Sequence, residues 1–408
     1  MFWSRRRTRW STEGALVLVF AMGALLALSA SLTLAKGKPP KPPAPPPPEP
    51  AYDFTQLPEN PSAMNDSGDA LGSPYGTGDI VALRSQPVMI PLDGLPGSSR
   101  VSKADLNNED AYGVFQVVGH CDFEVVEGSQ YRSHALLWEV DADTGEVSGP
   151  FDLDPENECL EDVAGAVNDL GEIAGFVQVE VEPGVAPLAP VVWRPDGTGG
   201  FEVLELPRHI LNGVAVFATP VDINNLGQVV GAADVRNALP GVHSMYPVLW
   251  QIDDSTGEYL EPIDLGTLKQ GAWSHPVAIN DWGQVIGYTD TKTSATFQAW
   301  LINPRDVDGD GALEWFWDGD GDGANDLMVP LCGAGVSSKP TGLNNVGQIV
   351  GSQRKKTGYG GQWGFIWQNG VMTLLGELVP PEYGDPVASC INDAGQLGAS
   401  GGIFTPRP

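Results

Sequence analysis

Positively charged side chains are scarce in this chain, and their scarcity removes whole classes of partner. Its 408 residues carry 22 Lys and Arg against 52 Asp and Glu, a formal net charge of −30. Such a field disfavours nucleic acid and anionic membrane surfaces, whereas calcium, polycations and basic proteins suit it better. High acidity is also a common solubility device, so the charge alone assigns no partner.

Cysteine and histidine are also rare. The four cysteines, Cys121, Cys159, Cys332 and Cys390, form no CxxC, so a cysteine zinc site is not indicated. Two disulfide pairings stay open in an exported chain, Cys121 with Cys159 and Cys332 with Cys390. The five histidines lie far apart and form no HExxH, so the sequence predicts neither a histidine metal site nor a histidine-based catalytic set.

Long apolar runs are absent except at the N-terminus. Four arginines between positions 5 and 9 precede an uncharged, mostly apolar run that ends in small residues, a layout typical of a secretory signal at residues 1–35. An uncleaved membrane anchor is the alternative, because the run is long enough to span a bilayer. The proline-rich residues 36–51 predict an extended linker. We therefore expect a secreted or cell-surface protein, with the periplasm as the alternative location, and a folded domain at 52–408.

A short phrase recurs seven times in that domain. Its fullest form is Asn-(Asn/Asp)-x-Gly-(Gln/Glu)-apolar-x-Gly, and the copies start at Asn65, Asn107, Asn168, Asn224, Asn280, Asn344 and Asn392. Asn and Gly favour a tight turn, because Asn caps its own turn and Gly adopts positive φ. Spacings of 42 to 64 residues are typical of one supersecondary unit that is copied along an array.

Each unit predicts four short strands joined by hairpins. In the unit around Asn224, extended runs lie at 220–223, 228–232, 246–250 and 263–265. The third run usually contains a tryptophan, which we expect to pack between neighbouring units. Because one apolar face cannot bury itself alone, the sequence predicts an all-β fold, a seven-bladed β-propeller of four-stranded blades. A linear β-solenoid is the competing arrangement.

The two ends of the domain complement each other. The last unit stops at Pro408 without a fourth strand, whereas residues 52–57 form an orphan strand. We expect the N-terminal strand to complete the C-terminal blade, which would leave no open sheet edge at the seam. We also expect a monomer.

The turn motif, followed by a strand such as Ser133-His134-Ala135-Leu136-Leu137-Trp138, resembles the extracellular HAF-repeat family. The resemblance covers roughly residues 52–408, although the other units keep the strand and lose the histidine. It implies a secreted repeat domain of bacterial type. The family has no assigned reaction, so the resemblance implies fold and location and adds no chemistry.

The fifth unit contains an acidic insertion at 306–326, which carries two copies of Asp-x-Asp-x-Asp-Gly. Alternating carboxylates place hard oxygen ligands on one side of a tight loop, and Gly311 and Gly323 allow the sharp turn. The first candidate calcium loop offers Asp306, Asp308, Asp310, the Ala312 carbonyl and Glu314. The second offers Asp318, which could serve both loops, then Asp320, Asp322, the Ala324 carbonyl and Asp326.

Neither loop has the glutamate expected at position twelve, because Trp317 and Val329 stand there. The insertion therefore resembles the helix-free calcium loops of dockerin and thrombospondin type 3 repeats. Such incomplete sites are expected to bind calcium weakly, at about 10⁻⁴ to 10⁻³ M. The alternative is a solvated acidic hairpin that binds no specific ion.

No catalytic group stands out in the sequence. Gly398–Gly402 matches G-x-S-x-G but precedes no helix, and carboxylates are too numerous for one pair to be chosen. We therefore predict a non-catalytic binding, adhesion or structural module. It would use the variable loops at 120–132, 180–188 and 234–245, with calcium as cofactor and an unknown extracellular protein or glycan as partner. Membrane contact is expected only through an uncleaved anchor.

An extracellular propeller hydrolase or lyase that acts on polysaccharide is the alternative function. A central pocket lined by carboxylates with Arg or Tyr would favour the enzyme. A channel without convergent titratable groups would favour the module.

Overall fold

A computed structural model describes most of the chain from residue 51 onward, within a compact unit at Pro48–Pro408. The described residues are 51–57, 60–72, 80–83, 89–126, 130–155, 161–178, 188–235, 245–253, 255–269, 272–290, 297–333, 336–355, 361–399 and 401–408. The expected signal or anchor at 1–35 and the linker, except for Ala51, lie outside them. Within the described ranges, no helix has the length and apolar character needed to cross a membrane.

The described residues form thirty β-strands, two short 3-10 turns and no α-helix, which confirms the all-β prediction. Most strands form antiparallel groups of four that follow chain order, and one parallel pairing, Glu161 with Ser133, joins the second and third groups into an eight-stranded sheet. The first three groups are β2 (Pro61–Met64), β3 (Ala70–Gly72), β4 (Ile80–Ala82) and β5 (Met89–Pro91); β6 (Arg100–Leu106), β7 (Val114–Val126), β8 (Gln130–Asp141) and β9 (Val147–Asp152); and β10 (Glu161–Val167), β11 (Ile173–Gln178), β12 (Leu188–Pro195) and β13 (Phe201–Glu205).

Three further groups follow the same antiparallel order. They are β16 (Ala218–Ile223), β17 (Val229–Asp234), β18 (Met245–Trp250) and β19 (Ile263–Asp264); β20 (Ser274–Ile279), β21 (Val285–Asp290), β22 (Phe297–Ile302) and β23 (Met328–Pro330); and β24 (Val336–Leu343), β25 (Ile349–Lys355), β26 (Trp363–Gln368) and β27 (Val371–Leu374). A ribbon of β14 (His209–Leu211) and β15 (Val214–Val216) lies between the third and fourth groups in the sequence. The 3-10 turns are η1 (Leu375–Glu377) and η2 (Pro381–Tyr383).

The last group joins the two ends of the folded part. β28 (Ala388–Ile391), β29 (Leu397–Ala399) and β30 (Gly402–Pro406) pair in order, and β1 (Tyr52–Gln56) adds the fourth strand. β1 runs antiparallel to β30, with Tyr52 opposite Pro406 and Gln56 opposite Gly402. The expected pairing of the orphan N-terminal strand with the last unit is therefore present.

The repeated phrase folds as a hairpin turn between the first and second strands of a group. In the fourth group, the Asn224 side-chain oxygen accepts the backbone N–H groups of Leu226 and Gln228, at 3.1 and 2.9 Å. Gly227 has a φ of +71°, a region that side chains disfavour. Gly231 has no room for a side chain, because an added Cβ would lie 2.6 Å from the Trp250 ring. Steric constraints therefore explain why glycine occupies both of these positions in the repeated phrase.

The second copy departs from this pattern. The Asn107 side-chain oxygen accepts the N–H of Gln116, nine residues later, whereas the other six copies use the residue four positions later. The turn is therefore a longer loop, and it carries the 88 % exposed side chain of Tyr112.

The third-strand tryptophans form the cores between groups. Trp138, Trp193, Trp250 and Trp300 are almost completely buried. Trp250, for example, packs in one cluster with Val192 and Leu206 of the preceding group. These contacts confirm the expected packing of the tryptophans between units. Burying a large aromatic ring stabilises the fold by about 2–3 kcal/mol.

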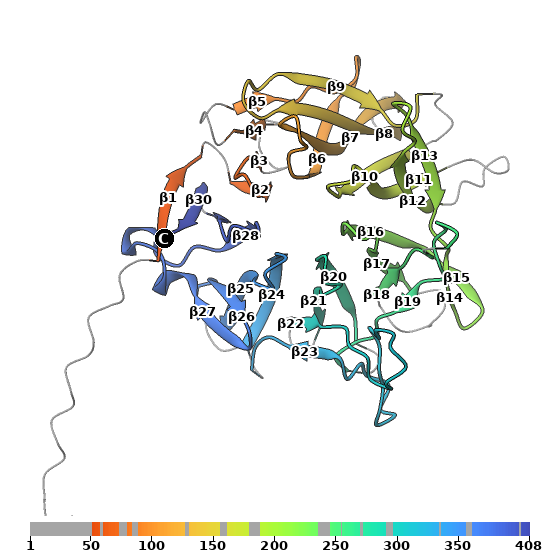
Figure 1. The fold of residues 1–408 in the computed structure, drawn as a ribbon, viewed down its shortest axis with the longest axis vertical. Helices are drawn as coiled ribbons and strands as arrows, with labels where there is room; N and C mark the ends of the chain where they lie inside the picture. The colour runs from red at the N-terminus through yellow and green to blue at the C-terminus, as the bar shows by residue number, and fades with distance from the viewer. Residues whose placement is uncertain are drawn as a thin grey trace, which may run out of the picture. The chain divides into compact units, whose positions relative to one another are not determined.

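The innermost strands β2, β6, β10, β16, β20, β24 and β28 lie around a common centre (Figure 1). The pairing register of every one of them shifts by one residue, which marks a β-bulge. The bulge falls three residues before the first asparagine of each repeated turn. A bulge re-aims the side chains next to it, so seven strands turn equivalent positions toward the same centre.

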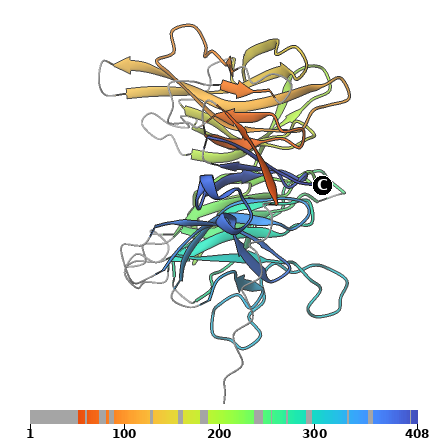
Figure 2. The ribbon, with the colours of Figure 1, turned by 90° about the vertical axis from the view of Figure 1, so that its left-hand side faces the viewer.

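One expected loop is instead a long hairpin. β7 and β8 pair from Val114 opposite Asp141 to Val126 opposite Gln130, and they extend past the shorter strands (Figure 2). The prediction of a variable loop at 120–132 is therefore wrong for residues 120–126 and 130–132, which continue both strands, whereas residues 127–129 lie outside the described residues. Residues 179–187 and 236–244, which make up most of the other two expected loops, lie outside the described residues.

Cys121, Cys332 and Cys390 are free and buried. Cys332 follows the outer strand β23 and contacts Met372, whereas Cys390 lies on the innermost strand β28, so the Cys332–Cys390 disulfide is not formed. Cys159, the expected partner of Cys121, lies outside the described residues.

Candidate functional site

The second residues of the seven turns form a closed circle of hydrogen bonds. The backbone N–H of each donates to the side-chain oxygen of the next, at 2.6 to 2.9 Å. The circle runs through Asp66, Asn108, Asp169, Asn225, Asp281, Asn345 and Asp393 and returns to Asp66. Asn and Asp alternate along it, except where Asp393 meets Asp66.

The first asparagines form a second chain of bonds beneath this circle. Each of six donates its side-chain N–H to the backbone carbonyl of the next turn's asparagine, at 2.8 to 3.0 Å. Asn392 closes this path onto Asn65, 327 residues earlier in the chain. The turns therefore hold all seven groups of strands together, which is a structural role for the repeated phrase.

A cavity of about 190 Å³ opens within the circle. Its walls are the paired asparagines and aspartates of the seven turns. Its floor consists of the seven aliphatic residues that precede those pairs, Met64, Leu106, Val167, Ile223, Ile279, Leu343 and Ile391. The lining therefore changes from polar to apolar with depth.

A second cavity of about 230 Å³ lies on the other side of this floor. The two cavities share Met64, Leu343 and Ile391, so they are consecutive along one axis. Each innermost strand lines the second cavity with two or three residues, and one of them always stands two positions before the first asparagine. The residues at that position are Ala63, Asp105, Ala166, Asp222, Ala278, Gly342 and Cys390.

Two carboxylates therefore converge in a chamber whose other lining residues are small, aliphatic or uncharged polar. Asp105 accepts the backbone N–H of Val167 at 3.1 Å, and Asp222 accepts those of Ile223 and Ile279 at 2.9 and 2.8 Å. Each carboxylate thus ties its own strand to the next group of strands.

Burial sets the protonation of this pair. It raises the pKa of Asp105 to about 6 and that of Asp222 to about 8, where the negative charge of Asp105 adds to the effect. No Lys, Arg or His lies among the described residues that line either cavity. At neutral pH the pair therefore combines a mostly ionised carboxylate with a mostly protonated carboxylic acid.

Cys390 is the third titratable group of the chamber. Burial raises the pKa of its thiol to about 12. A neutral thiol is a poor nucleophile, so Cys390 does not supply nucleophilic chemistry at neutral pH.

The acidic insertion follows β22 and is anchored by two buried side chains. The Trp315 indole donates to the carbonyl of Gly283, in the repeated turn of the same group, at 2.8 Å. The Asn325 amide donates to the carbonyls of Leu265 and Trp315, each at 2.8 Å. The aspartates lie outside this anchor and are largely exposed.

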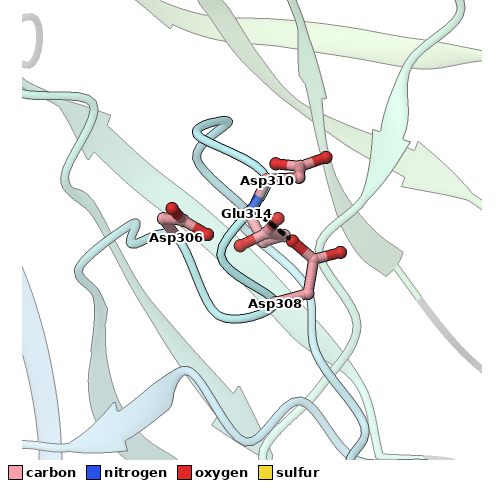
Figure 3. A group of neighbouring side chains, drawn as sticks. All are labelled: Asp306, Asp308, Asp310 and Glu314. Carbon is pink, nitrogen blue, oxygen red and sulfur yellow. Dashed lines mark hydrogen bonds between the residues drawn. The ribbon is translucent and has the colours of Figure 1, made fainter. Parts of the chain in front are cut away.

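The first loop brings four of the expected calcium ligands together. Carboxylate oxygens of Asp306, Asp308, Asp310 and Glu314 lie within 4.8 Å of one another (Figure 3). Asp306 accepts the N–H groups of Gly309 and Gly311 at 2.6 and 3.1 Å, so the loop wraps around its first carboxylate. Gly311 has a φ of +96°, as the sharp turn requires.

The second loop repeats this geometry. Asp318 accepts the N–H groups of Gly321 and Gly323 at 2.8 and 3.0 Å, and its carboxylate lies within 4.8 Å of those of Asp320 and Asp326. Asp318 groups with this loop and not with the first. Asp322 accepts the N–H of Ala324 at 2.8 Å and is outside the group of three.

No family model matches the chain, and no curated protein matches it. Among solved structures, it is similar to a Hadza microbial sialidase, with 12 % identity and a TM-score of 0.37 over 64 % of this chain and 57 % of the other. It is also similar to a PL25 ulvan lyase, with 11 % identity and a TM-score of 0.36 over 85 % of this chain and 80 % of the other. A third is the polysaccharide lyase Uly1, with 10 % identity and a TM-score of 0.37 over 75 and 76 %.

The chain thus spans little more than half the length of the sialidase. No residue role and no substrate is carried over at this level of similarity.

The prediction of a non-catalytic binding, adhesion or structural module is wrong. The three solved structures named above are a sialidase and two polysaccharide lyases, which are enzymes and not binding modules. A non-catalytic module would have a channel without convergent titratable groups. In this chamber two such groups, Asp105 and Asp222, converge. Among the described residues that line it, there is no Arg or Tyr of the kind that we expected in an enzymatic pocket.

Proposed function

We propose that the domain is a seven-bladed β-propeller in which the N-terminal strand completes the last blade. Seven groups of four antiparallel strands, the pairing of β1 with β30 and the circle of turn hydrogen bonds support this arrangement. A propeller leaves an axial channel between its innermost strands, and the two consecutive cavities lie along such an axis.

We propose that the protein is an extracellular carbohydrate hydrolase with Asp105 and Asp222 as its acid–base pair. The observation that carries this proposal is the convergence of two carboxyl groups, with pKa values displaced to about 6 and about 8, in one chamber. Two carboxyl groups whose environments separate their protonation states are what glycoside hydrolysis requires.

The chemistry follows from the two protonation states. Asp222 donates its proton to the departing glycosidic oxygen as the bond between that oxygen and the anomeric carbon breaks. Water adds to the anomeric carbon, and its proton passes to Asp105. The two carboxyl groups then exchange one proton with solvent to restore the starting state.

The charge of the chamber selects hydrolysis over elimination and a neutral sugar over an acidic one. Elimination from a uronic acid requires a cation to neutralise the substrate carboxylate. None lines either cavity among the described residues. A net charge of −30 also repels acidic polysaccharides. We therefore assign neutral glycosides as the substrate class.

The test uses 4-nitrophenyl glycosides of neutral hexoses and pentoses, soluble neutral polysaccharides and 4-nitrophenyl glucuronide. We expect hydrolysis of a neutral substrate and a loss of about 10²–10⁴-fold in Asp105→Asn and Asp222→Asn. Asp143→Asn, an exposed turn residue of the β8–β9 hairpin, is the matched control with unchanged rate. The rate should peak between pH 6 and 8. Hydrolysis that survives in the Asp105→Asn/Asp222→Asn double variant would overturn the assignment, as would the absence of hydrolysis of every neutral substrate.

We further propose that both acidic loops bind calcium. The grouping of carboxylates in each loop and the repeated wrapping of backbone N–H groups around Asp306 and Asp318 support this reading. Calorimetric titration with Ca²⁺ should give heat with the native protein and little with the Asp308→Ala/Asp320→Ala variant. Identical heats would exclude both sites.

We propose a secreted or cell-surface location, and membership of the HAF-repeat family, on the signal-like N-terminus and the repeated turn. N-terminal sequencing of the exported protein tests the location. A mature chain that begins near residue 36 supports secretion, and a retained N-terminus supports the anchor.

A further inference from the structure

An arc of exposed apolar side chains lies on the face that carries the repeated turns. The third residues of four consecutive turns are Leu170, Leu226, Trp282 and Val346, and their side chains are 62, 62, 71 and 55 % exposed. Single exposed apolar residues are ordinary, but four from consecutive turns around one cavity form a patch, and such patches mark sites of interaction.

The arc is held rigidly. The backbone N–H of each of the four residues donates to the side chain of its own turn's first asparagine, at 3.1 to 3.2 Å. The Trp282 indole also donates to the carbonyl of Asn345 in the next turn, at 2.9 Å. A partner would therefore meet a preformed surface and lose little conformational entropy of the protein on docking.

Two of the circle's four aspartates adjoin each other on the opposite side of the same face, whereas Asp169 and Asp281 stand beside the arc and are separated by Asn225. On that opposite side the third residues are the small Ser67 and Ala394, and the adjacent second residues are Asp66 and Asp393. The backbone N–H of Asp393 donates to the Asp66 carboxylate at 2.7 Å, but no asparagine separates the two carboxylates as it does elsewhere in the circle. Partial burial and the neighbouring Asp393 charge raise the pKa of Asp66.

The cavity of about 190 Å³ lies between the arc and this acidic pair, with an aliphatic floor. Across the face, an occupant would meet exposed apolar side chains, an aliphatic pocket, and then two carboxylates. That order complements a basic side chain flanked by apolar ones. Nucleic acid and anionic membranes lack the matching charge.

We propose that the turn face docks a partner protein through a short segment in which one lysine or arginine is flanked by apolar residues. The basic side chain crosses the cavity to Asp66 and Asp393, and its apolar neighbours contact Trp282 and Leu226. The docking face uses neither residue of the proposed acid–base pair, because Asp105 and Asp222 line the other cavity, beyond the aliphatic floor.

Three end-blocked tripeptides test the proposal by calorimetry and fluorescence titration: Ac-Phe-Lys-Leu-NH2, its glutamate counterpart Ac-Phe-Glu-Leu-NH2, and Ac-Gly-Lys-Gly-NH2. We expect measurable binding of the first only, with an affinity that falls as NaCl rises. Trp282→Ala and Asp393→Asn should each weaken it by about tenfold, as loss of one anchor at an interface does. Val371→Ala, an exposed apolar residue of β27, is the matched control with unchanged affinity.

Equal binding of the lysine and glutamate peptides would overturn the proposal, and so would unchanged affinity in Trp282→Ala. A dissociation constant for the first peptide weaker than about 1 mM would also overturn it, because that affinity is too weak for a specific segment. Since Trp282 is exposed, its removal should leave the urea unfolding curve intact. The rate of glycoside hydrolysis should stay at the native level in Trp282→Ala and Asp393→Asn, because neither residue belongs to the proposed acid–base pair.

Discussion

The acidic insertion and the axial chamber both present aspartates, but in opposite surroundings. In the insertion, most of the carboxylates are exposed and accept backbone N–H groups from their own loop. In the chamber, Asp105 and Asp222 lie among small and aliphatic residues and accept N–H groups from neighbouring groups of strands. Water solvates the first set, whereas burial displaces the pKa of the second.

The difference shows that the density of acidic residues is a poor guide to reactive ones. A crowded, solvated loop can hold its charges apart or share a cation between them. A carboxyl group that is partly desolvated in a cavity keeps its proton to a higher pH, so one with a pKa near 8, such as Asp222, can act as an acid at neutral pH.

The largest expected effect is on the pH dependence of stability. The pKa of Asp222 is raised to about 8 when folded and is near 3.8 when unfolded, so the folded state holds more protons between pH 4 and 8. Stability should therefore fall as pH rises through this window, by about 3–5 kcal/mol from this residue. Urea unfolding at several pH values should show a shallower fall in Asp222→Asn. If the free energy of unfolding depends on pH equally in Asp222→Asn and the native protein, the Asp222 carboxyl group is solvated like those of the insertion.

The anchor of the insertion gives the next effect. Asn325 is buried and hydrogen-bonds the carbonyls of Leu265 and Trp315, so Asn325→Ala leaves two buried carbonyls without a donor. We expect a loss of about 2–4 kcal/mol in urea unfolding. The exposed Asp196→Ala, in a turn of the third group, is a control that should cost under about 1 kcal/mol. Equal losses would mean that the insertion is not fastened to the domain.

Calcium should have a smaller effect. At about tenfold above a dissociation constant of 10⁻³ M, binding to one loop adds about 1.4 kcal/mol to the free energy of unfolding. Thermal unfolding with 10 mM CaCl2 against 10 mM MgCl2 measures it. The Asp308→Ala/Asp320→Ala variant should lose the calcium increment. An increment that survives this double substitution would assign the effect to another part of the protein.

The smallest effect belongs to an intermediate case, the exposed Asp66 beside Asp393. Its pKa is raised, so the ionised pair costs stability above about pH 4 and the cost disappears as the pair becomes protonated. Asp66→Asn should stabilise the protein by under about 1 kcal/mol at pH 7 and by less at pH 4. Urea unfolding of Asp66→Asn and the native protein at pH 7 and pH 4 measures this effect. A stabilisation that is larger at pH 4 than at pH 7 would contradict the prediction.

The sequence supported the fold more fully than the site. Alternating apolar residues and Asn-Gly turns are local signals, and they predicted the four-strand units, the buried tryptophans and the pairing of Tyr52–Gln56 with the last unit. The Asp-x-Asp-x-Asp-Gly spacing predicted which carboxylates of the insertion would lie together. The hairpin of β7 and β8 was missed because its residues pair beyond the length of a normal unit.

Asp105 and Asp222 could not be paired from spacing, because they belong to the second and fourth units and meet only when the groups of strands surround one axis. One signal was present. Both stand two residues before the first asparagine of a turn, where the other units place Ala, Gly or Cys. An alignment of the seven copies on that asparagine would have shown two charged residues at a position otherwise reserved for small ones.

The circle of turn hydrogen bonds also imposes a rule of parity. A ring of alternating asparagine and aspartate closes without conflict only if its number of members is even, and this ring has seven. One pair of like neighbours is unavoidable. It falls between Asp393 and Asp66, where the last unit of the chain meets the first. The two ends of an otherwise repetitive chain thus have a mismatch that no internal junction shares, and adding or removing one unit would abolish it.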